Sequence, residues 1–209
     1  MAEKLTFDAA ETALVVVDMQ NDFCEPEGFY GKAGMDISGL MAPTAPLAAL
    51  LGRAREAGMT VVFTRIVREK GEAAENQHKL LPKRWFSFGE RLMRGSWGAE
   101  VVDPLCPREG ELIVDKIGYS SFEGTTLERD LKERGVTTIL LTGVVTYACV
   151  LATGFAAFDK GFDVALISDA AGSWNEGLGN ATGEIVDLLM GRTLRSDEIQ
   201  FTPRREAAA

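Results

Sequence analysis

Three side chains that could supply an acid, a base and a nucleophile each follow a short apolar run. Asp18 comes directly after 13–17, Lys116 shortly after 112–114, and Cys149 a few residues after 138–142. A thiolate attacks carbonyl carbon atoms, an ammonium group stabilises the thiolate, and a carboxylate can accept the thiol proton. The same residue types also have structural explanations, because a cysteine in an apolar helix is often a small core residue. Asp and Lys at strand ends often only cap a loop or reach solvent.

The number of histidines limits the kinds of catalytic and metal-binding site that the chain can form. The 209 residues include one histidine, His78. A catalytic triad with a histidine base would need His78, and a metal site with several histidine ligands is impossible. We therefore expect acid–base work to fall on carboxylate, lysine or cysteine, and we predict no metal ion and no cofactor. His78 itself is expected to be a lid or surface residue.

The apolar runs predict the strands of a parallel sheet. Every residue of 13–17 is apolar, as is typical of a strand buried on both faces. Segments with helical periodicity separate the runs, and three of these segments end at a glycine. The other predicted strands are 60–64, 112–114, 138–142, 164–167 and a weak strand near 193–199, and the predicted helices are 42–57, 125–134, 146–160 and 180–191.

This alternation predicts an α/β fold with a doubly wound, mainly parallel sheet of about six strands. We assign residues 1–209 to a single domain. Residues 66–98 break the alternation and are rich in basic and aromatic side chains, which suggests an irregular, lid-like excursion. Ligands of such sheets bind outside the carboxyl ends of the strands. We therefore expect Asp18, Lys116 and Cys149 to converge on one crevice.

The segment around Cys149 predicts an activated thiol. Thr146 is in the position of a helix N-cap, which would put Cys149 in the first turn, where amide dipoles favour negative charge. Lys116 would add a full positive charge, and Asp18 would take the thiol proton. The backbone N–H groups of Val145 and Cys149 are natural donors for an oxyanion hole.

Composition excludes several classes of partner. The chain has 22 basic and 31 acidic residues, a net charge of −9, which argues against nucleic acid and anionic lipid. No apolar stretch approaches the roughly 20 residues of a membrane helix, and the N-terminal residues do not resemble a signal peptide. Three cysteines are too few for a disulfide framework. We predict a cytoplasmic, reduced protein with a small-molecule substrate and no membrane partner.

Five segments, in order, resemble the isochorismatase-like cysteine hydrolase family. The opening segment 15–23 reads VVVDMQNDF, and the nucleophile segment 142–150 reads TGVVTYACV. The remaining three are GSWGAE at 95–100, DK at 115–116 followed by YSSF at 119–122, and SDA at 168–170. One such motif would be a weak indication, but five in the same order across about 13–197 are specific.

The resemblance implies a three-layer α/β/α fold around a six-stranded sheet. It also implies a catalytic triad of Asp18 as general base, Lys116 as electrostatic partner and Cys149 as nucleophile. A cis peptide between Val144 and Val145 would turn the Val145 N–H toward the oxyanion, beside the N–H of Cys149. Members of this kind are commonly homodimers or homotetramers.

The presence of Cys149 favours one branch of the family. Members that cleave the vinyl ether of isochorismate typically lack this cysteine, and nicotinamidases typically carry an Asp/His metal cluster that is missing here. The closest likeness is to ureidoacrylate, biuret and N-carbamoyl amidohydrolases, which implies hydrolysis of a small amide, ureide or N-carbamoyl compound through a covalent acyl-enzyme. The predicted substrate-binding residues are Phe23, Tyr119, Asn21 and Arg84, with Trp85 and Tyr147 as further wall candidates and Arg65 as an alternative to Arg84.

Alternatives stay open at this point. The first is a vinyl-ether hydrolase of the isochorismatase type, and the second is a non-catalytic binding or scaffold member of the same fold. Cys24 and Cys106 are expected to be structural, although Cys24 is close enough to Asp18 in sequence to edge the pocket.

Overall fold

The centre of the molecule is a six-stranded sheet in which every pair of neighbouring strands is parallel. The structure, a computed structural model, describes residues 4–69 and 90–204. The strand order is β4-β3-β2-β5-β6-β7. The bounds are β2 Thr12–Val17, β3 Thr60–Ile66, β4 Leu112–Lys116, β5 Thr138–Val144, β6 Asp163–Gly172 and β7 Gly191–Leu194. The predicted sheet is therefore confirmed.

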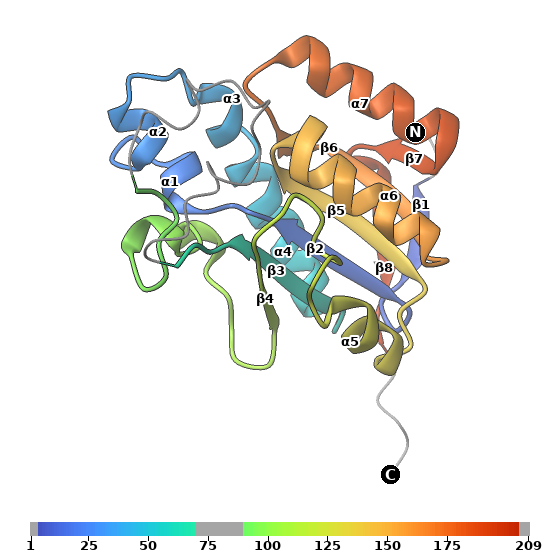
Figure 1. Cartoon of the computed structure of the whole chain (residues 1–209). Helices are drawn as coiled ribbons and strands as arrows, with labels where there is room; N and C mark the ends of the chain where they lie inside the picture. The colour runs from blue at the N-terminus through green and yellow to red at the C-terminus, as the bar shows by residue number, and fades with distance from the viewer. Residues whose placement is uncertain (1–3, 70–89, 205–209) are drawn as a thin grey trace.

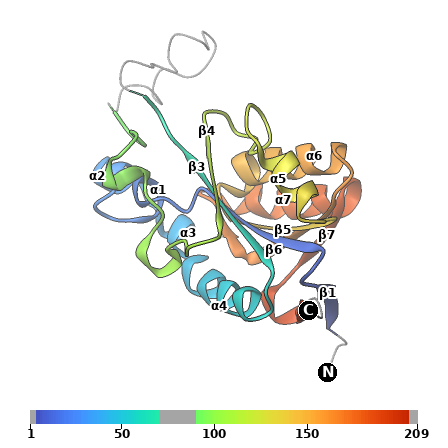
Figure 2. The same ribbon diagram turned by 90° about the horizontal axis from the view of Figure 1, so that it is seen from below.

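Helices cover both faces of this sheet. The helix α4 (Thr44–Glu56) lies on one face, and α5 (Leu127–Glu133), α6 (Leu151–Asp159) and α7 (Glu176–Leu189) lie on the other (Figures 1 and 2). This is the expected three-layer arrangement. Because the strand order reverses between β2 and β5, the crevice at their carboxyl ends is the place where such a fold binds ligands.

The apolar runs of the sequence form the core of the protein, because their residues are buried between the two helical layers. All six residues of β2 are buried, because β2 lies in the middle of the sheet with helices on both sides. Three helices end just before the predicted glycines Gly58, Gly135 and Gly161, each of which has a positive φ. The predicted boundaries of these helices are thus correct to within a few residues at their carboxyl ends.

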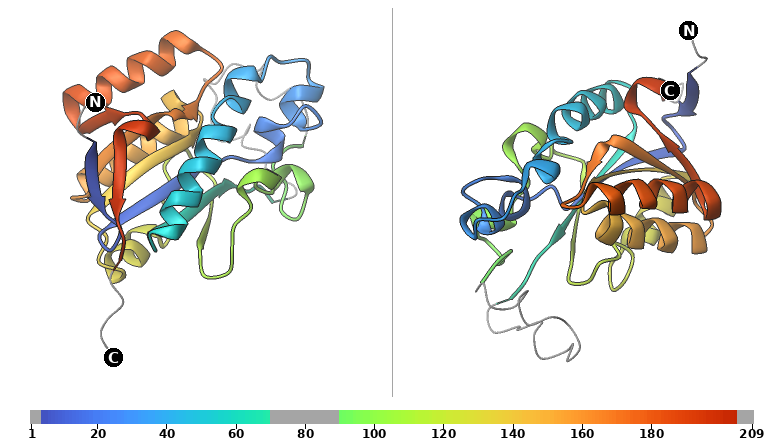
Figure 3. Two further views of the ribbon diagram at one scale, coloured as in Figure 1. Left: turned by 180° about the vertical axis from the view of Figure 1, so that it is seen from behind. Right: turned by 90° about the horizontal axis from the view of Figure 1, so that it is seen from above.

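The C-terminal part differs from the prediction. The weak strand near 193–199 is two strands, β7 and β8 (Ile199–Thr202), separated by a 3-10 helix at Ser196–Glu198. The strand β8 pairs with β1 (Leu5–Asp8) in a second, two-stranded parallel sheet, shown in Figure 3. The helix α7 begins at Glu176 rather than 180, because the side chain of Asn175 caps it by accepting a hydrogen bond from Leu178 N.

The loops at the carboxyl end of the sheet contain short helices that the sequence did not predict. The first three follow β2 and gather beside its end (Figure 1). They are α1 Asn21–Cys24, α2 Phe29–Lys32 and α3 Ser38–Met41, and 3-10 helices follow at Trp97–Ala99 and Asp103–Leu105. Much of the predicted excursion, with His78, Arg84 and Trp85, lies outside the described residues. Its two flanks meet through a β-bridge between Arg68 and Met93.

Across residues 4–69 and 90–204, the structure has no helix with the length and apolar character needed to cross a membrane.

Candidate active site

Asp18 and Lys116 form a buried ion pair at the carboxyl end of the sheet. Asp18 follows β2 directly, has a left-handed backbone with a φ of 50°, and is fully buried. Lys116 is the last residue of β4, two strands away, and its side chain reaches past β3. The distance from Lys116 Nζ to Asp18 Oδ2 is 2.7 Å. The two side chains that the sequence placed at strand ends therefore meet as predicted.

The Lys116 ammonium group is held by three oxygen acceptors. Besides Asp18, it donates to the backbone carbonyls of Gly118 at 3.1 Å and Tyr119 at 3.0 Å. Burial alone would lower the pKa of Lys116, but the adjacent Asp18 carboxylate and Cys149 outweigh burial and raise this pKa above its ordinary value. Lys116 is therefore a cation that cannot rotate away from the site without losing several bonds.

Cys149 is the third member of the cluster. It follows β5, which lies on the other side of β2 from β3 and β4. The strand β5 ends at Val144, the Val144–Val145 peptide is cis as the resemblance implies, and a π-helix runs over Thr146–Val150. The side chain of Cys149 lies within hydrogen-bonding reach of both Asp18 and Lys116, and 4 % of the residue is exposed. The structure thus brings together all three side chains that the sequence singled out.

The surroundings of Cys149 shift the pKa of its thiol in the direction opposite to the one that the sequence led us to expect. Burial and the neighbouring Asp18 carboxylate raise the pKa of the Cys149 thiol, and the opposing effect of Lys116 is smaller. Thr146 does not cap the helix, because its hydroxyl donates to the carbonyl of Gly172 at 2.8 Å. The direction of this shift favours a protonated Cys149 thiol beside the Asp18 carboxylate.

This difference predicts how the three cysteines react with iodoacetamide. Cys106 is exposed, whereas Cys24 and Cys149 are buried. At neutral pH we expect Cys106 to be alkylated at least about tenfold faster than Cys149, whose rate should rise as the pH increases into the alkaline range. Peptide mapping after timed labelling gives the three rates. Preferential labelling of Cys149 under mildly acidic conditions would show that it is a thiolate after all.

The residues after Asp18 anchor the surrounding loops. The side chain of Asn21, a predicted substrate ligand, donates to the carbonyl of Trp97 at 2.7 Å, and its backbone N–H donates to Glu100 O. The side chain of Gln20 bonds to both backbone polar groups of Ile66, and that of Asp22 accepts hydrogen bonds from two backbone N–H groups. Asn21 therefore acts here as an anchor. The three consecutive polar residues at 20–22, shortly after a buried strand, were the available signal for this role.

The other predicted substrate-binding residues have varied surroundings. Phe23 is buried and stacks on Tyr30, with ring centroids 5.2 Å apart. Tyr119 is largely exposed beside Lys116. The alternative cation, Arg65, is paired with Glu100 and Asp115 at 2.7 and 2.9 Å and belongs to a surface ion network. Arg84, Trp85 and His78 lie outside the described residues.

Sequence reasoning missed Thr64, which touches the candidate base directly. Thr64 lies on β3, between the strands that carry Asp18 and Lys116, and its hydroxyl donates to Asp18 Oδ1 at 2.8 Å. A polar residue directly after the apolar run 61–63, in register with the residue before Asp18, was a signal for it.

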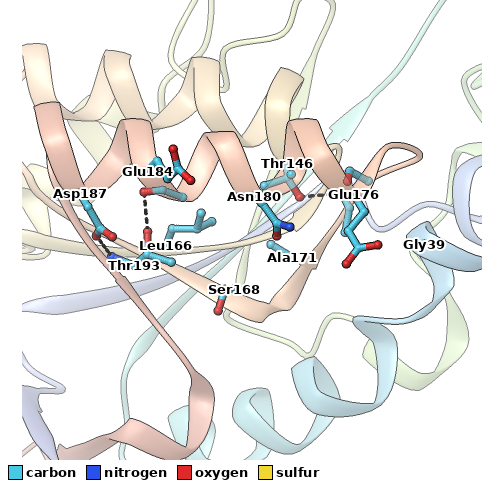
Figure 4. A pocket seen from close by; sticks show the side chains of 14 residues that line it. Gly39, Thr146, Leu166, Ser168, Ala171, Glu176, Asn180, Glu184, Asp187 and Thr193 are labelled. Carbon is cyan, nitrogen blue, oxygen red and sulfur yellow. Dashed lines mark hydrogen bonds between the residues drawn. The ribbon is translucent and has the colours of Figure 1, made fainter.

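A cavity of about 580 Å³ lies beside the N-terminal end of the π-helix Thr146–Val150, between α7 and the strands β6 and β7 (Figure 4). Thr146 lines it, but none of the three cluster residues does. The hydroxyl groups of Ser168 and Thr193 on its wall donate to backbone carbonyls. Its charged lining residues come from α7 and are Glu176, Glu184 and Asp187. The cavity is thus separate from the Asp18, Lys116 and Cys149 side chains.

Among the residues that the structure describes, no group of three or more His, Cys, Asp or Glu side chains could hold a metal ion. Cys24 is buried, and burial is the main cause that raises the pKa of its thiol.

A doubly wound parallel sheet that gathers a buried carboxylate, ammonium and thiol at its switch point defines an α/β enzyme of the hydrolase type. Known proteins identify the family. The isochorismatase domain model matches residues 12–191, so the chain belongs to the isochorismatase family.

Individual relatives agree with this assignment. Ureidoacrylate amidohydrolase RutB of Variovorax paradoxus is 34% identical over an alignment of 179 residues, with 80% of this chain and 71% of the relative covered. A cysteine hydrolase from Pseudomonas syringae superposes with a TM-score of 0.79 at 26% identity, covering 94% of this chain and 93% of the other. N-carbamoylsarcosine amidase from Thermoplasma acidophilum superposes with a TM-score of 0.71 at 25% identity, covering 90% and 97%.

Proposed function

We propose that this protein is a cysteine-dependent amidohydrolase that cleaves a C–N bond of a small amide, ureide or N-carbamoyl compound. The observation that carries the proposal is the contact of the Cys149 side chain with both Asp18 and Lys116 in one buried cluster. A thiol beside a carboxylate and an ammonium group has the parts needed for nucleophilic attack on a carbonyl group.

In the first half of the reaction, the sulfur of Cys149 attacks the carbonyl carbon and its proton passes to Asp18. A neutral resting thiol suits this step, because the proton moves only when the C–S bond forms. When the tetrahedral intermediate collapses, the C–N bond breaks and Asp18 returns the proton to the leaving nitrogen. Lys116 stays charged and stabilises the ionised carboxylate before and after the transfer.

In the second half, water attacks the thioester and gives a proton to Asp18. The C–S bond breaks, the sulfur leaves as thiolate, and Asp18 returns the proton to it. We assign the oxyanion to the backbone N–H groups of Val145 and Cys149. In support, Val145 is the N-cap residue of the π-helix that contains Cys149, so both N–H groups belong to one turn.

The substrate class follows from what the relatives have in common. One is named for ureidoacrylate and another for N-carbamoylsarcosine, and both compounds carry a carbonyl group between nitrogen atoms. The relative that is 34% identical over 179 residues is the one named for ureidoacrylate. We therefore propose a ureido or carbamoyl group as the reacting part of the substrate.

A release assay tests this function. Purified protein is incubated with a panel of small amides, ureides and N-carbamoyl acids, and ammonia and free amines are measured, with Cys149→Ala as the control. We expect turnover of at least one ureido or carbamoyl compound by the native chain alone. Pyruvate release from isochorismate without any amide hydrolysis would favour the vinyl-ether alternative, and inactivity on both groups would favour a binding or scaffold role.

Two further expectations concern the environment of the enzyme. All three cysteines are unpaired, which fits the reducing cytoplasm.

The family resemblance implies a homodimer or homotetramer, and light scattering of the purified chain will measure this state.

A further inference from the structure

The buried hydroxyl of Thr64 sits where the general base of the proposed reaction must be oriented. Thr64 is fully buried on β3 and is in register with Val17, the residue before Asp18. It bonds to Asp18 twice: its carbonyl oxygen accepts from the Asp18 N–H at 3.1 Å, and its hydroxyl donates to Asp18 Oδ1 at 2.8 Å. Both the backbone and the side chain of Asp18 are therefore fixed by one residue.

The two oxygens of the Asp18 carboxylate have different partners. Thr64 donates to Oδ1 and Lys116 donates to Oδ2 at 2.7 Å. Because the donors come from two different strands and bind opposite oxygens, together they determine how the plane of the carboxylate is turned about its own axis. The remaining lone pairs are those available to the thiol of Cys149.

We propose that Thr64 is a positioning residue that orients Asp18 toward the proton of Cys149. The inference rests on the proposed function, since it assigns Thr64 a role in that same reaction. Without the hydroxyl, Lys116 alone would hold the carboxylate, which could then turn about the remaining bond. Proton transfer depends strongly on such alignment, so the chemical step would slow while substrate binding would be little affected.

The chain offers a matched control for this substitution. Thr142, on β5, is also fully buried, and its hydroxyl donates to the carbonyl of Val15 at 2.9 Å. Replacing either threonine by valine removes one buried hydroxyl and keeps the branched shape. Only Thr64→Val removes a bond to Asp18.

The experiment compares Thr64→Val, Thr64→Ser and Thr142→Val on the best substrate of the release assay. We expect Thr64→Val to lower kcat by about 10- to 100-fold with KM changed by less than about threefold. Thr64→Ser keeps the donor and should recover most of kcat. Thr142→Val should keep native kcat and KM, and thermal unfolding of all three variants reports any loss of stability.

The outcomes separate this inference from the proposed function. Native kcat in Thr64→Val, or an equal loss of kcat in Thr142→Val and Thr64→Val, would overturn the role of Thr64 and leave the cysteine mechanism standing. If Thr64→Val does not fold, failure of Thr64→Ser to retain kcat in a folded protein would also overturn the role. Activity that survives Cys149→Ala would refute the proposed function itself.

Discussion

Replacing Cys149 by alanine is expected to lower kcat/KM by at least about 10⁴-fold, because no other group in the cluster can form the covalent acyl-enzyme. The protein should stay folded. Cys149 is buried, but the substitution removes a single sulfur atom, and its cost in unfolding free energy should be about 1–2 kcal/mol. Steady-state kinetics and thermal unfolding measure the two effects.

Cys106→Ala is the matched control, since it makes the same substitution at an exposed cysteine that is not a member of the cluster. We expect it to have native activity. Cys149→Ser, which keeps a hydroxyl in place of the thiol, should be nearly as inactive as the alanine variant. A serine variant with substantial turnover would mean that the nucleophile is not the sulfur.

Replacing Lys116 by methionine is expected to damage both stability and activity. The substitution leaves the Asp18 carboxylate buried without its cationic partner, which typically costs about 3–5 kcal/mol of unfolding free energy. It also removes the cation that faces the proposed base and holds it in place, so kcat/KM should fall by at least about 100-fold. Urea unfolding and steady-state kinetics on the folded fraction check the two parts.

The double variant Asp18→Asn/Lys116→Met separates the two effects. With neither charge present, we expect it to regain part of the lost stability and none of the activity. Full stability in Lys116→Met alone would mean that the ion pair is not buried as described.

Because the pKa of Lys116 is raised in the folded protein, the free energy of unfolding depends on pH in the alkaline range. Its folded pKa lies above the ordinary value of 10.5, so its contribution to stability is present below about that pH and is lost as the pH rises through the folded pKa. The native chain should therefore lose this stability in strongly alkaline solution, and Lys116→Met should lack this component of the loss.

The sheet could be predicted because its strands are buried on both faces. The strand β2 has no polar face, so its apolar run stands out against the amphipathic helices on either side. The pairing of β1 with β8 could not be predicted in the same way. Both strands are short and mostly exposed, and they join opposite ends of the chain, so no local pattern indicates their contact.

The candidate cluster could be predicted from a different rule. Asp18, Lys116 and Cys149 lie at or shortly after the carboxyl ends of parallel strands, and these ends share one edge of the sheet. The protonation state of Cys149 could not be predicted, because it depends on how completely the thiol is buried and on its contact with Asp18. The roles of Thr64 and Asn21 depend on hydrogen bonds between distant segments and needed the three-dimensional structure.

The most direct test of the cysteine mechanism is mass spectrometry of the enzyme quenched in acid during turnover of a saturating substrate. Digestion and peptide mapping then locate any acyl group. The mechanism predicts a substrate-derived acyl group on the peptide that contains Cys149 and on neither of the peptides with Cys24 and Cys106. Sustained turnover with the Cys149 peptide unmodified at every quench time, or with the acyl group on another residue, would contradict it.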